Sequence, residues 1–192
     1  MPANTKLKIV SRANILIGGD PIPALDSSTA EAIVGETMYE DIVRDALLNT
    51  RWRFATAQDV ITRTGVTPLG RWDSEYDKPS DCLMINAITI NDVPIHYDVY
   101  GEYIYCNAVS TDTVVMDYIL RPDEKYWPAY FTLAVEFLLA GVMAVSIARD
   151  AQLASLLEQK SERQLYKARR LDSQQQTTRR LDTSEFLRQR LS

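Results

Sequence analysis

The spacing of apolar residues predicts a short first helix. Leu7, Val10 and Ile17 recur at helical intervals, which favours a helix over residues 5–17. Two glycines follow, as is common at a helix C-terminus, and a loop with two prolines comes next. We therefore expect one short helix and then a loop that leads to a longer helix.

A capping signal marks the start of the second helix. Ser28 and Glu31 have the spacing of a capping box, and we expect the helix to cover residues 29–49. Its apolar residues follow the i, i+3, i+4, i+7 spacing of a helix with one face on a core. They are Tyr39, Ile42, Val43, Ala46 and Leu47.

Acidic residues gather away from that apolar stripe. Glu36, Glu40 and Asp41 lie largely off it, and only Arg44 offsets them nearby in the sequence. The pattern predicts an acidic outer face on this helix. Such a face is either a functional surface that repels anions or an ordinary solvated surface.

The middle of the chain predicts a loop and then strands. Residues 65–81 contain two glycines and two prolines, so we expect a long loop, which carries Trp72 and Tyr76. Residues 83–120 hold alternating apolar and polar stretches with a tight turn at Asn91, and they predict a small antiparallel β-sheet. The two aromatic residues either anchor a partner protein or pack on the sheet.

Two more helices are predicted over residues 127–148 and 151–171. The first contains eighteen residues, from 131 to 148, in which Glu136 is the one charge. That length is at the margin of a membrane span, but a glutamate at the centre of a bilayer is costly. We expect a core helix buried on several sides, and a membrane-anchored subunit is the alternative.

The order of these elements predicts an α+β fold. We expect mainly a bundle of four helices with an inserted small antiparallel β-sheet, together forming one domain over residues 1–172. Residues 173–192 form an extended C-terminal arm with too little apolar area to fold alone, so it should become ordered on a partner. Its candidate binding residues are Arg179, Arg180, Phe186, Leu187, Arg188, Arg190 and Leu191.

Charge is unevenly distributed along the 192 residues. Residues 1–148 carry eleven Lys and Arg against twenty Asp and Glu, whereas residues 149–192 carry ten against six. An acidic body argues against sequence-specific DNA binding, which needs basic residues to neutralise phosphates. A basic C-terminal region suggests an acidic partner surface.

Residue types that support catalysis are scarce. The chain has one histidine, His96, and two cysteines, Cys82 and Cys106, which are not spaced as a metal or redox motif. It also lacks the glycine-rich phosphate loops and the nucleophile elbow of common enzyme families. We expect no enzyme activity, no catalytic residue, no metal and no cofactor, and a small ligand-binding domain is an alternative.

Four motifs, in chain order, resemble the head-to-tail adaptor proteins of tailed bacteriophages, the tail tubular protein A or gatekeeper family. A further helix with Tyr166, Ala168 and Asp172 follows them, so the resemblance spans about residues 7–172. Lys78 departs from the family, which has a leucine before this proline. The motifs are the Gly-Asp-Pro-Ile-Pro-Ala-Leu-Asp-Ser-Ser loop at 19–28, Leu48 with Trp52, Phe54 and Ala55, the segment Tyr76-Asp77-Lys78-Pro79-Ser80-Asp81-Cys82-Leu83, and Trp127-Pro128-Ala129-Tyr130-Phe131.

The resemblance implies a structural virion protein. Members of this family form a ring, usually of twelve subunits, below the portal protein. The ring extends the channel for double-stranded DNA, which passes without sequence-specific binding, and offers a surface to the tail nozzle or to a tail-tube or stopper protein. The expected location is the head-tail connector of the virion, with the host cytoplasm during assembly and no membrane.

The resemblance also suggests roles for the candidate residues. Glu36, Glu40 and Asp41 would line the channel and repel DNA. Trp72 and Tyr76 would contact the tail or a neighbouring subunit. The arginines and apolar residues of the C-terminal arm would bind the portal.

Overall fold

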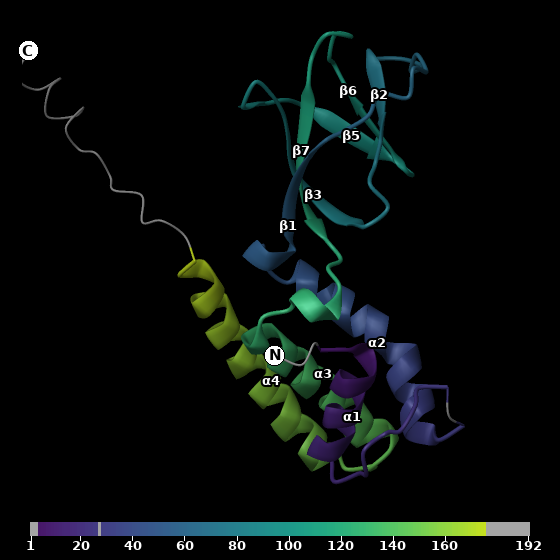
Figure 1. The fold of residues 1–192 in the computed structure, drawn as a ribbon, viewed down its shortest axis with the longest axis vertical. Helices are drawn as coiled ribbons and strands as arrows, with labels where there is room; N and C mark the ends of the chain where they lie inside the picture. The colour runs from purple at the N-terminus through teal and green to yellow at the C-terminus, as the bar shows by residue number, and fades with distance from the viewer. Residues whose placement is uncertain (1–3, 27, 176–192) are drawn as a thin grey trace, which may run out of the picture.

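In a computed structural model, residues 4–26 and 28–175 are described, and they form an α+β fold with a helical bundle at one end and strands at the other (Figure 1). The four expected helices are confirmed, with bounds that agree to within two residues. Short 3-10 turns, η1 and η2, lie where the chain enters and leaves the strands. The helices are α1 (Lys6–Leu16), α2 (Ala30–Leu48), α3 (Ala129–Ser146) and α4 (Ala151–Ser173), and the turns are η1 (Arg53–Ala55) and η2 (Glu124–Tyr126).

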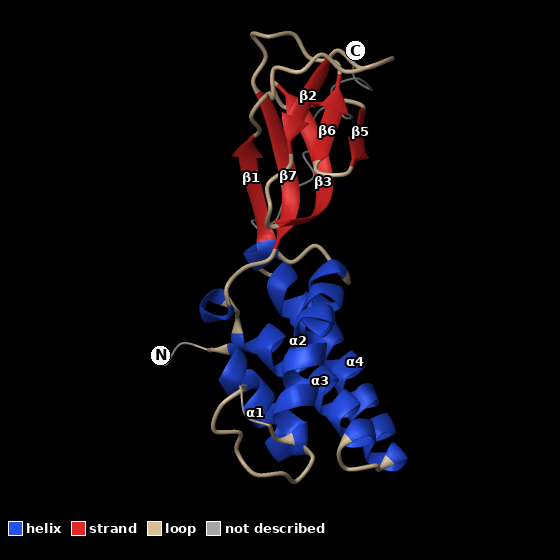
Figure 2. Cartoon of the chain, turned by 90° about the vertical axis from the view of Figure 1, so that its right-hand side faces the viewer, coloured by secondary structure: helices blue, strands red, loops and turns tan. Residues whose placement is uncertain are grey.

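The strands form two antiparallel sheets, not the single sheet expected from residue 83 onward (Figure 2). One sheet has the order β1-β7-β3-β4 and the other the order β2-β6-β5. Two strands lie before residue 83, where the sequence predicted no sheet. One is a half-exposed edge strand and the other has only four residues between two loops, so neither shows clear apolar alternation. The strands are β1 (Thr56–Val60), β2 (Ser74–Asp77), β3 (Cys82–Ile90), β4 (Val93–Pro94), β5 (Tyr97–Tyr100), β6 (Tyr103–Cys106) and β7 (Val114–Leu120).

The tight turn after β3 is confirmed. Asn91 and Asp92 both have positive φ, 50° and 63°, and Ile90 pairs with Val93 across the turn. Asn and Asp tolerate this conformation, which the two-residue turns of hairpins require. The chain after the turn forms two strands in different sheets: β4 pairs with β3, whereas β5 pairs with β6.

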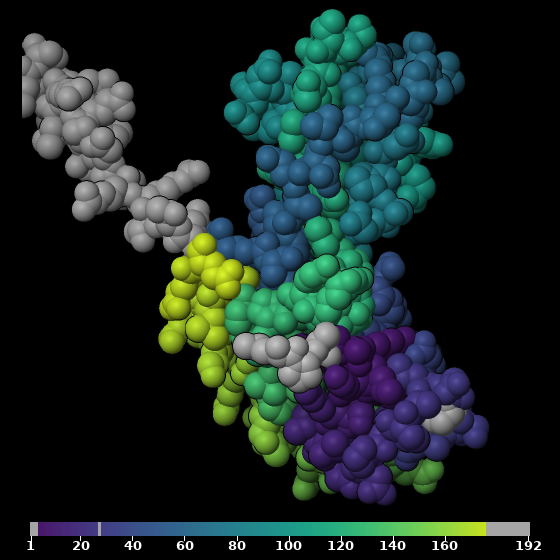
Figure 3. Space-filling view, in the orientation of Figure 1, coloured from purple at the N-terminus to yellow at the C-terminus, as the bar shows by residue number. Residues whose placement is uncertain are grey.

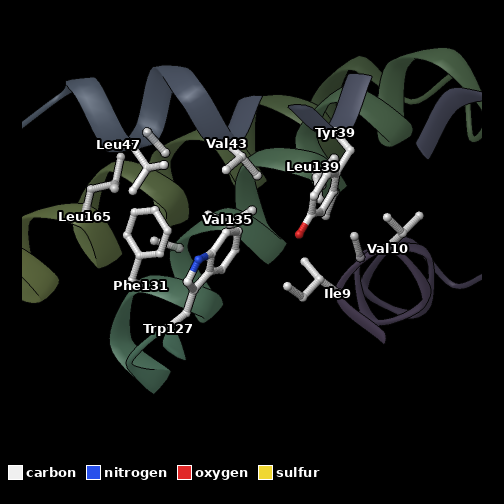
Figure 4. Packing of buried hydrophobic residues seen from close by; sticks show 14 of the residues in the cluster. Ile9, Val10, Tyr39, Val43, Leu47, Trp127, Phe131, Val135, Leu139 and Leu165 are labelled. Carbon is white, nitrogen blue, oxygen red and sulfur yellow. The ribbon is translucent and has the colours of Figure 1, made fainter. Parts of the chain in front are cut away.

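Each end of the molecule has its own hydrophobic core. Side chains from all four helices meet in the larger core, where Tyr39 and Val43 of α2 face Leu139 of α3 (Figure 4). The smaller core lies between the two sheets and contains Ile104 and Met116. The end of β7 reaches the helical core through Ile119, so the two ends are joined by packing as well as by the chain.

Helix α3 lies at the centre of the bundle and contacts the other three helices. It is long and apolar enough to cross a membrane, with a mean hydropathy of 1.8, and half of it is buried inside this fold. Its one charged residue, Glu136, is 6% exposed and forms an ion pair with Arg12 of α1 at 3.0 Å. Burial raises the pKa of Glu136, although Arg12 opposes this effect.

The N-terminus of α2 is capped one residue later than the sequence suggested. Thr29, not Ser28, is the N-cap, and its hydroxyl accepts a hydrogen bond from the Ala32 N–H at 3.4 Å. Glu31 is then the second residue of the helix, not the third, so the predicted capping box is wrong in register.

Helices α1 and α2 pack tightly against each other at Gly35. A Cβ atom at this position would lie 2.2 Å from Cγ1 of Val10, which is fully buried. We expect Gly35→Ala to lower the free energy of unfolding by about 1–3 kcal/mol through overpacking, measured by urea denaturation. In a Val10→Ala background the same change should instead stabilise, because alanine favours the helix over glycine. Equal effects in the two backgrounds would contradict this explanation.

The junction between bundle and strands is organised by Arg121, which directly follows β7. Its side chain is 17% exposed and binds Glu40 of α2 at 3.1 Å and Glu124 of η2 at 2.7 Å. It also donates to the Pro122 carbonyl at 2.6 Å and lies over the ring of Trp127, 5.2 Å from its centroid. The guanidinium therefore links α2, the end of β7 and the start of α3.

Candidate functional site

The acidic residues of α2 are more compensated than the sequence suggested. Glu36 forms an ion pair with Lys6 at 2.6 Å, and Glu40 binds both Arg44 and Arg121. Burial raises the pKa of Glu40, but the hydrogen bonds from Arg121 and Arg44 outweigh it and leave the pKa below its ordinary value. Arg44 is the basic partner nearby in the sequence, as expected, but Lys6 and Arg121 from distant parts of the chain also pair with these glutamates, so the outer face is less acidic than the sequence suggested.

A different part of α2 carries the unpaired carboxylates. Asp41 and Asp45 are both exposed, are one helical turn apart, and form no ion pair with any described residue. They point away from the side of α2 that holds Tyr39 and Val43 in the core. Of the three residues expected to line a channel, Asp41 alone is free of a described basic partner.

Tyr76 is a core residue and not part of a contact loop. It lies in β2, is 3% exposed, and belongs to the core between the sheets. Burial raises the pKa of its hydroxyl. The strand also divides the long loop expected over residues 65–81 into two loops, over residues 65–73 and 78–81.

Trp72 does lie on that loop, and an aromatic surface forms around it. We use the name aromatic patch for Val66, Thr67, Pro68, Leu69, Trp72, Glu75, Tyr100 and Tyr105, which line an open cavity of about 410 Å³. The side chain of Leu69 is fully exposed, and the rings of Tyr100 and Tyr105 lie 5.3 Å apart. Tyr100 is exposed and Trp72 and Tyr105 are half-buried, and aromatic rings beside an open hollow are typical of protein contact surfaces.

Polar contacts hold the aromatic patch in shape. Arg71 forms an ion pair with Asp98, and its guanidinium lies 5.1 Å from the centroid of the Trp72 ring. The Tyr100 hydroxyl donates to Asp98 at 2.9 Å, and hydrogen bonds from Tyr100 and Arg71 lower the pKa of the Asp98 carboxyl. These contacts fix the loop against β5, so the patch is preformed.

Glu75 supports the same surface from below. It is 7% exposed and accepts hydrogen bonds from the hydroxyls of Tyr105 at 2.7 Å and Thr64 at 2.8 Å. The bond to Glu75 raises the pKa of Tyr105. With both carboxylate oxygens occupied, Glu75 acts here as a structural acceptor.

The root of the C-terminal arm is anchored at Asp172, near the end of α4. Its carboxylate is 4% exposed and accepts hydrogen bonds from the Arg53 N–H and the Tyr130 hydroxyl, both at 2.8 Å. Burial and this bond raise the pKa of Tyr130. The contacts bring the end of α4 to the junction with the strands.

The arm residues expected to bind a portal lie outside the described residues. They are Arg179, Arg180, Phe186, Leu187, Arg188, Arg190 and Leu191. Their role in portal binding stays a prediction. The described structure shows only where α4 ends, which is the point from which the arm continues.

Sequence reasoning missed a basic stripe on α4. Lys160, Arg163, Lys167 and Arg170 are exposed, follow helical spacing along one side, and form no ion pair with any residue in the described part of the chain. Like charges at i, i+3, i+7 and i+10 were the available signal. We call these four residues the α4 basic stripe.

Helices α3 and α4 also border a shallow apolar groove of about 280 Å³. Leu138, Val142 and Val145 line it from α3, and Ala154 and Glu158 line it from α4.

Among residues 4–26 and 28–175, no three or more His, Cys, Asp or Glu side chains lie close enough together to hold a metal ion. His96 is exposed, and burial raises the pKa of both Cys82 and Cys106.

Comparison with known proteins adds no relative. Neither the models of known protein families nor the curated proteins contain a match to this chain.

Proposed function

We propose that this chain is a structural virion protein that forms a head-to-tail adaptor ring below a portal. Such a ring would extend the DNA channel and provide the attachment surface for the tail. Double-stranded DNA would pass through it without sequence-specific contacts, and the protein would have no enzymatic role.

The observation that carries this proposal is where the adaptor-like motifs lie in the fold. The loop that begins at Gly19 joins α1 to α2, and the segment from Leu48 to Ala55 leads from α2 into β1. The segment that begins at Tyr76 joins β2 to β3, and the one at Trp127 opens α3. All four segments therefore lie at junctions between elements, and the two at Leu48 and Trp127 connect the bundle with the strands.

The surfaces of the molecule support an assembling subunit. The space-filling view shows an elongated shape with the strands above and the bundle below (Figure 3). The aromatic patch lies on the strand end, whereas the arm begins where α4 ends, so tail and portal contacts can be separate. A ring subunit needs several distinct contact surfaces, and this chain offers them.

The test measures assembly of the full chain, alone and mixed with the portal ring of the same virus. A monomer has a mass of 21.8 kDa, so native mass spectrometry separates monomer, ring and portal-bound ring. We expect a ring of many copies on the portal. A full chain that stays monomeric and does not bind the portal would overturn the proposal.

The role of the arm has its own variant in that experiment. Removing residues 176–192 leaves every described helix and strand intact, so circular dichroism and thermal unfolding should be unchanged. We expect the shortened chain to lose binding to the portal, because the arm supplies basic residues and apolar anchors. Portal binding equal to that of the full chain would show that the arm is not the anchor.

A further inference from the structure

Two opposite sides of the bundle carry unpaired charges of opposite sign. Helix α3 lies in the middle, with α4 on one flank and α2 on the other (Figure 1). The outward side of α2 presents Asp41 and Asp45, and the outward side of α4 presents the α4 basic stripe. Neither set has a described partner within its own chain, although each charge would be more stable beside an opposite one.

We propose that α2 of one subunit docks on α4 of the next, with Asp41 and Asp45 beside Arg163 and Lys167 of the neighbour. This inference rests on the proposed ring and names the two faces that build it. Because the faces differ and lie on opposite flanks, the contact is heterologous and repeats from copy to copy, which closes a ring at a suitable rotation.

The spacing of the charges fits this contact. Asp41 and Asp45 are four residues apart, as are Arg163 and Lys167, so each pair spans about 6 Å along its helix. Both helices run from the far end of the bundle towards the strands, so they are parallel when copies stand side by side (Figure 1). Two parallel rows with equal spacing bring each carboxylate to one cation.

The heights of the charges along the molecule also agree. The hydrogen bond of 2.8 Å between the Arg53 N–H and Asp172 places the end of α4 level with the turn that follows α2. Asp45 then lies about one helical turn below the end of α2, and Lys167 lies slightly more than one turn below Asp172. A rotation about an axis parallel to the long axis of the molecule therefore aligns them.

Apolar side chains accompany the charges on both faces. Leu48 on α2 is 41% exposed, and Leu156 and Tyr166 on α4 are 49% and 71% exposed. Burying them would add hydrophobic stabilisation to a contact whose charges mainly set pairing and register. The charged and apolar side chains of α2 and α4 thus favour binding of each helix to the other helix of a second copy.

Charge reversal in the full chain tests the contact. We expect Asp41→Lys with Asp45→Lys, and separately Arg163→Glu with Lys167→Glu, each to lower ring yield at least tenfold, because like charges then face each other. Combining all four changes should restore the ring. A matched control for the α2 reversal, Asp73→Lys with Glu102→Lys on the strand end, changes the net charge by the same amount and sign and should leave ring formation unchanged.

Cross-linking tests the register directly. Asp45→Cys with Lys167→Cys should give a ladder of covalent multimers on a non-reducing gel after mild oxidation. The unmodified chain, in which Cys106 is buried and Cys82 is half-buried, should give no such ladder.

The outcomes separate this inference from the function it rests on. A wild-type chain that forms no ring, even with the portal, overturns the proposed function. A wild-type ring that survives both reversals overturns the pairing of α2 with α4. If the α2 reversal leaves the ring intact but slows DNA passage, Asp41 lines the channel. If the α4 reversal only weakens DNA binding, the α4 basic stripe faces DNA.

Discussion

Replacing Trp52 with alanine is expected to lower the free energy of unfolding by about 3–5 kcal/mol, the usual cost of removing a fully buried aromatic side chain. Trp52 is 0% exposed, and its ring lies 5.2 Å from that of Phe131 and 6.0 Å from that of Phe54. Its indole N–H donates to the Ala46 carbonyl at 2.8 Å, so the side chain links the last turns of α2 to the segment that leads into β1. Guanidinium chloride unfolding measures the loss.

A second variant separates the two contributions of Trp52. Trp52→Phe keeps an aromatic ring in the core but loses the hydrogen bond to Ala46 and part of the volume. We expect it to cost less than half as much as the alanine variant. If both variants unfold at the denaturant concentration of the wild type, the aromatic contacts at the junction do not stabilise this fold.

Replacing Arg121 with methionine is expected to cost about 2–3 kcal/mol, somewhat less than breaking a fully buried ion pair because Glu40 is partly exposed. The change leaves Glu40 and Glu124 beside each other at the junction without their shared cation. Arg44→Met is the matched control, since Arg44 also binds Glu40, at 2.9 Å, but its side chain is 55% exposed. That control should cost no more than about 0.5 kcal/mol.

The same cluster gives a pH dependence with a definite sign. Burial raises the pKa values of Glu40 and Glu124, but hydrogen bonds from Arg121 outweigh it and hold both below their ordinary value of 4.5 in the folded chain. The unfolded chain therefore binds protons at higher pH, and the stabilisation present above pH 4.5 is lost as pH falls through the lower folded values. Arg121→Met should flatten this acid limb of the unfolding curve. An unchanged acid limb would show that the cluster contributes nothing to it.

The helices were predictable from sequence because their local signals agree with the fold. Helical spacing, the loop after α1 and the apolar run of α3 each marked an element that the structure contains. Strand β1 was left outside the predicted sheet because it is a half-exposed edge strand, and its pairing with β7 joins residues about sixty positions apart. Long-range pairing of that kind leaves no mark in a local pattern.

The candidate functional residues were likewise predictable only in part from the sequence. The sequence placed acidic residues on α2, but it could not show that Lys6 and Arg121 reach Glu36 and Glu40 from other elements. It placed Trp72 on a loop correctly, and it placed Tyr76 there wrongly because four strand residues between glycine-rich and proline-rich stretches resemble a loop. Whether a charged side chain is free or paired depends on tertiary contacts, which the local sequence does not show.

The two hydrogen bonds at Asp172 give α4 a mechanical role. Tension applied to the chain beyond Gln175 passes through the last residues of α4 to Asp172, whose carboxylate is bonded to the backbone N–H of Arg53 and to the hydroxyl of Tyr130. Those bonds lie across the end of α4, so a pull on its C-terminus is shared with α3 and with the turn before β1 before the helix can unravel from its end. A force on the arm is therefore shared with the junction between bundle and strands and is not carried by α4 alone.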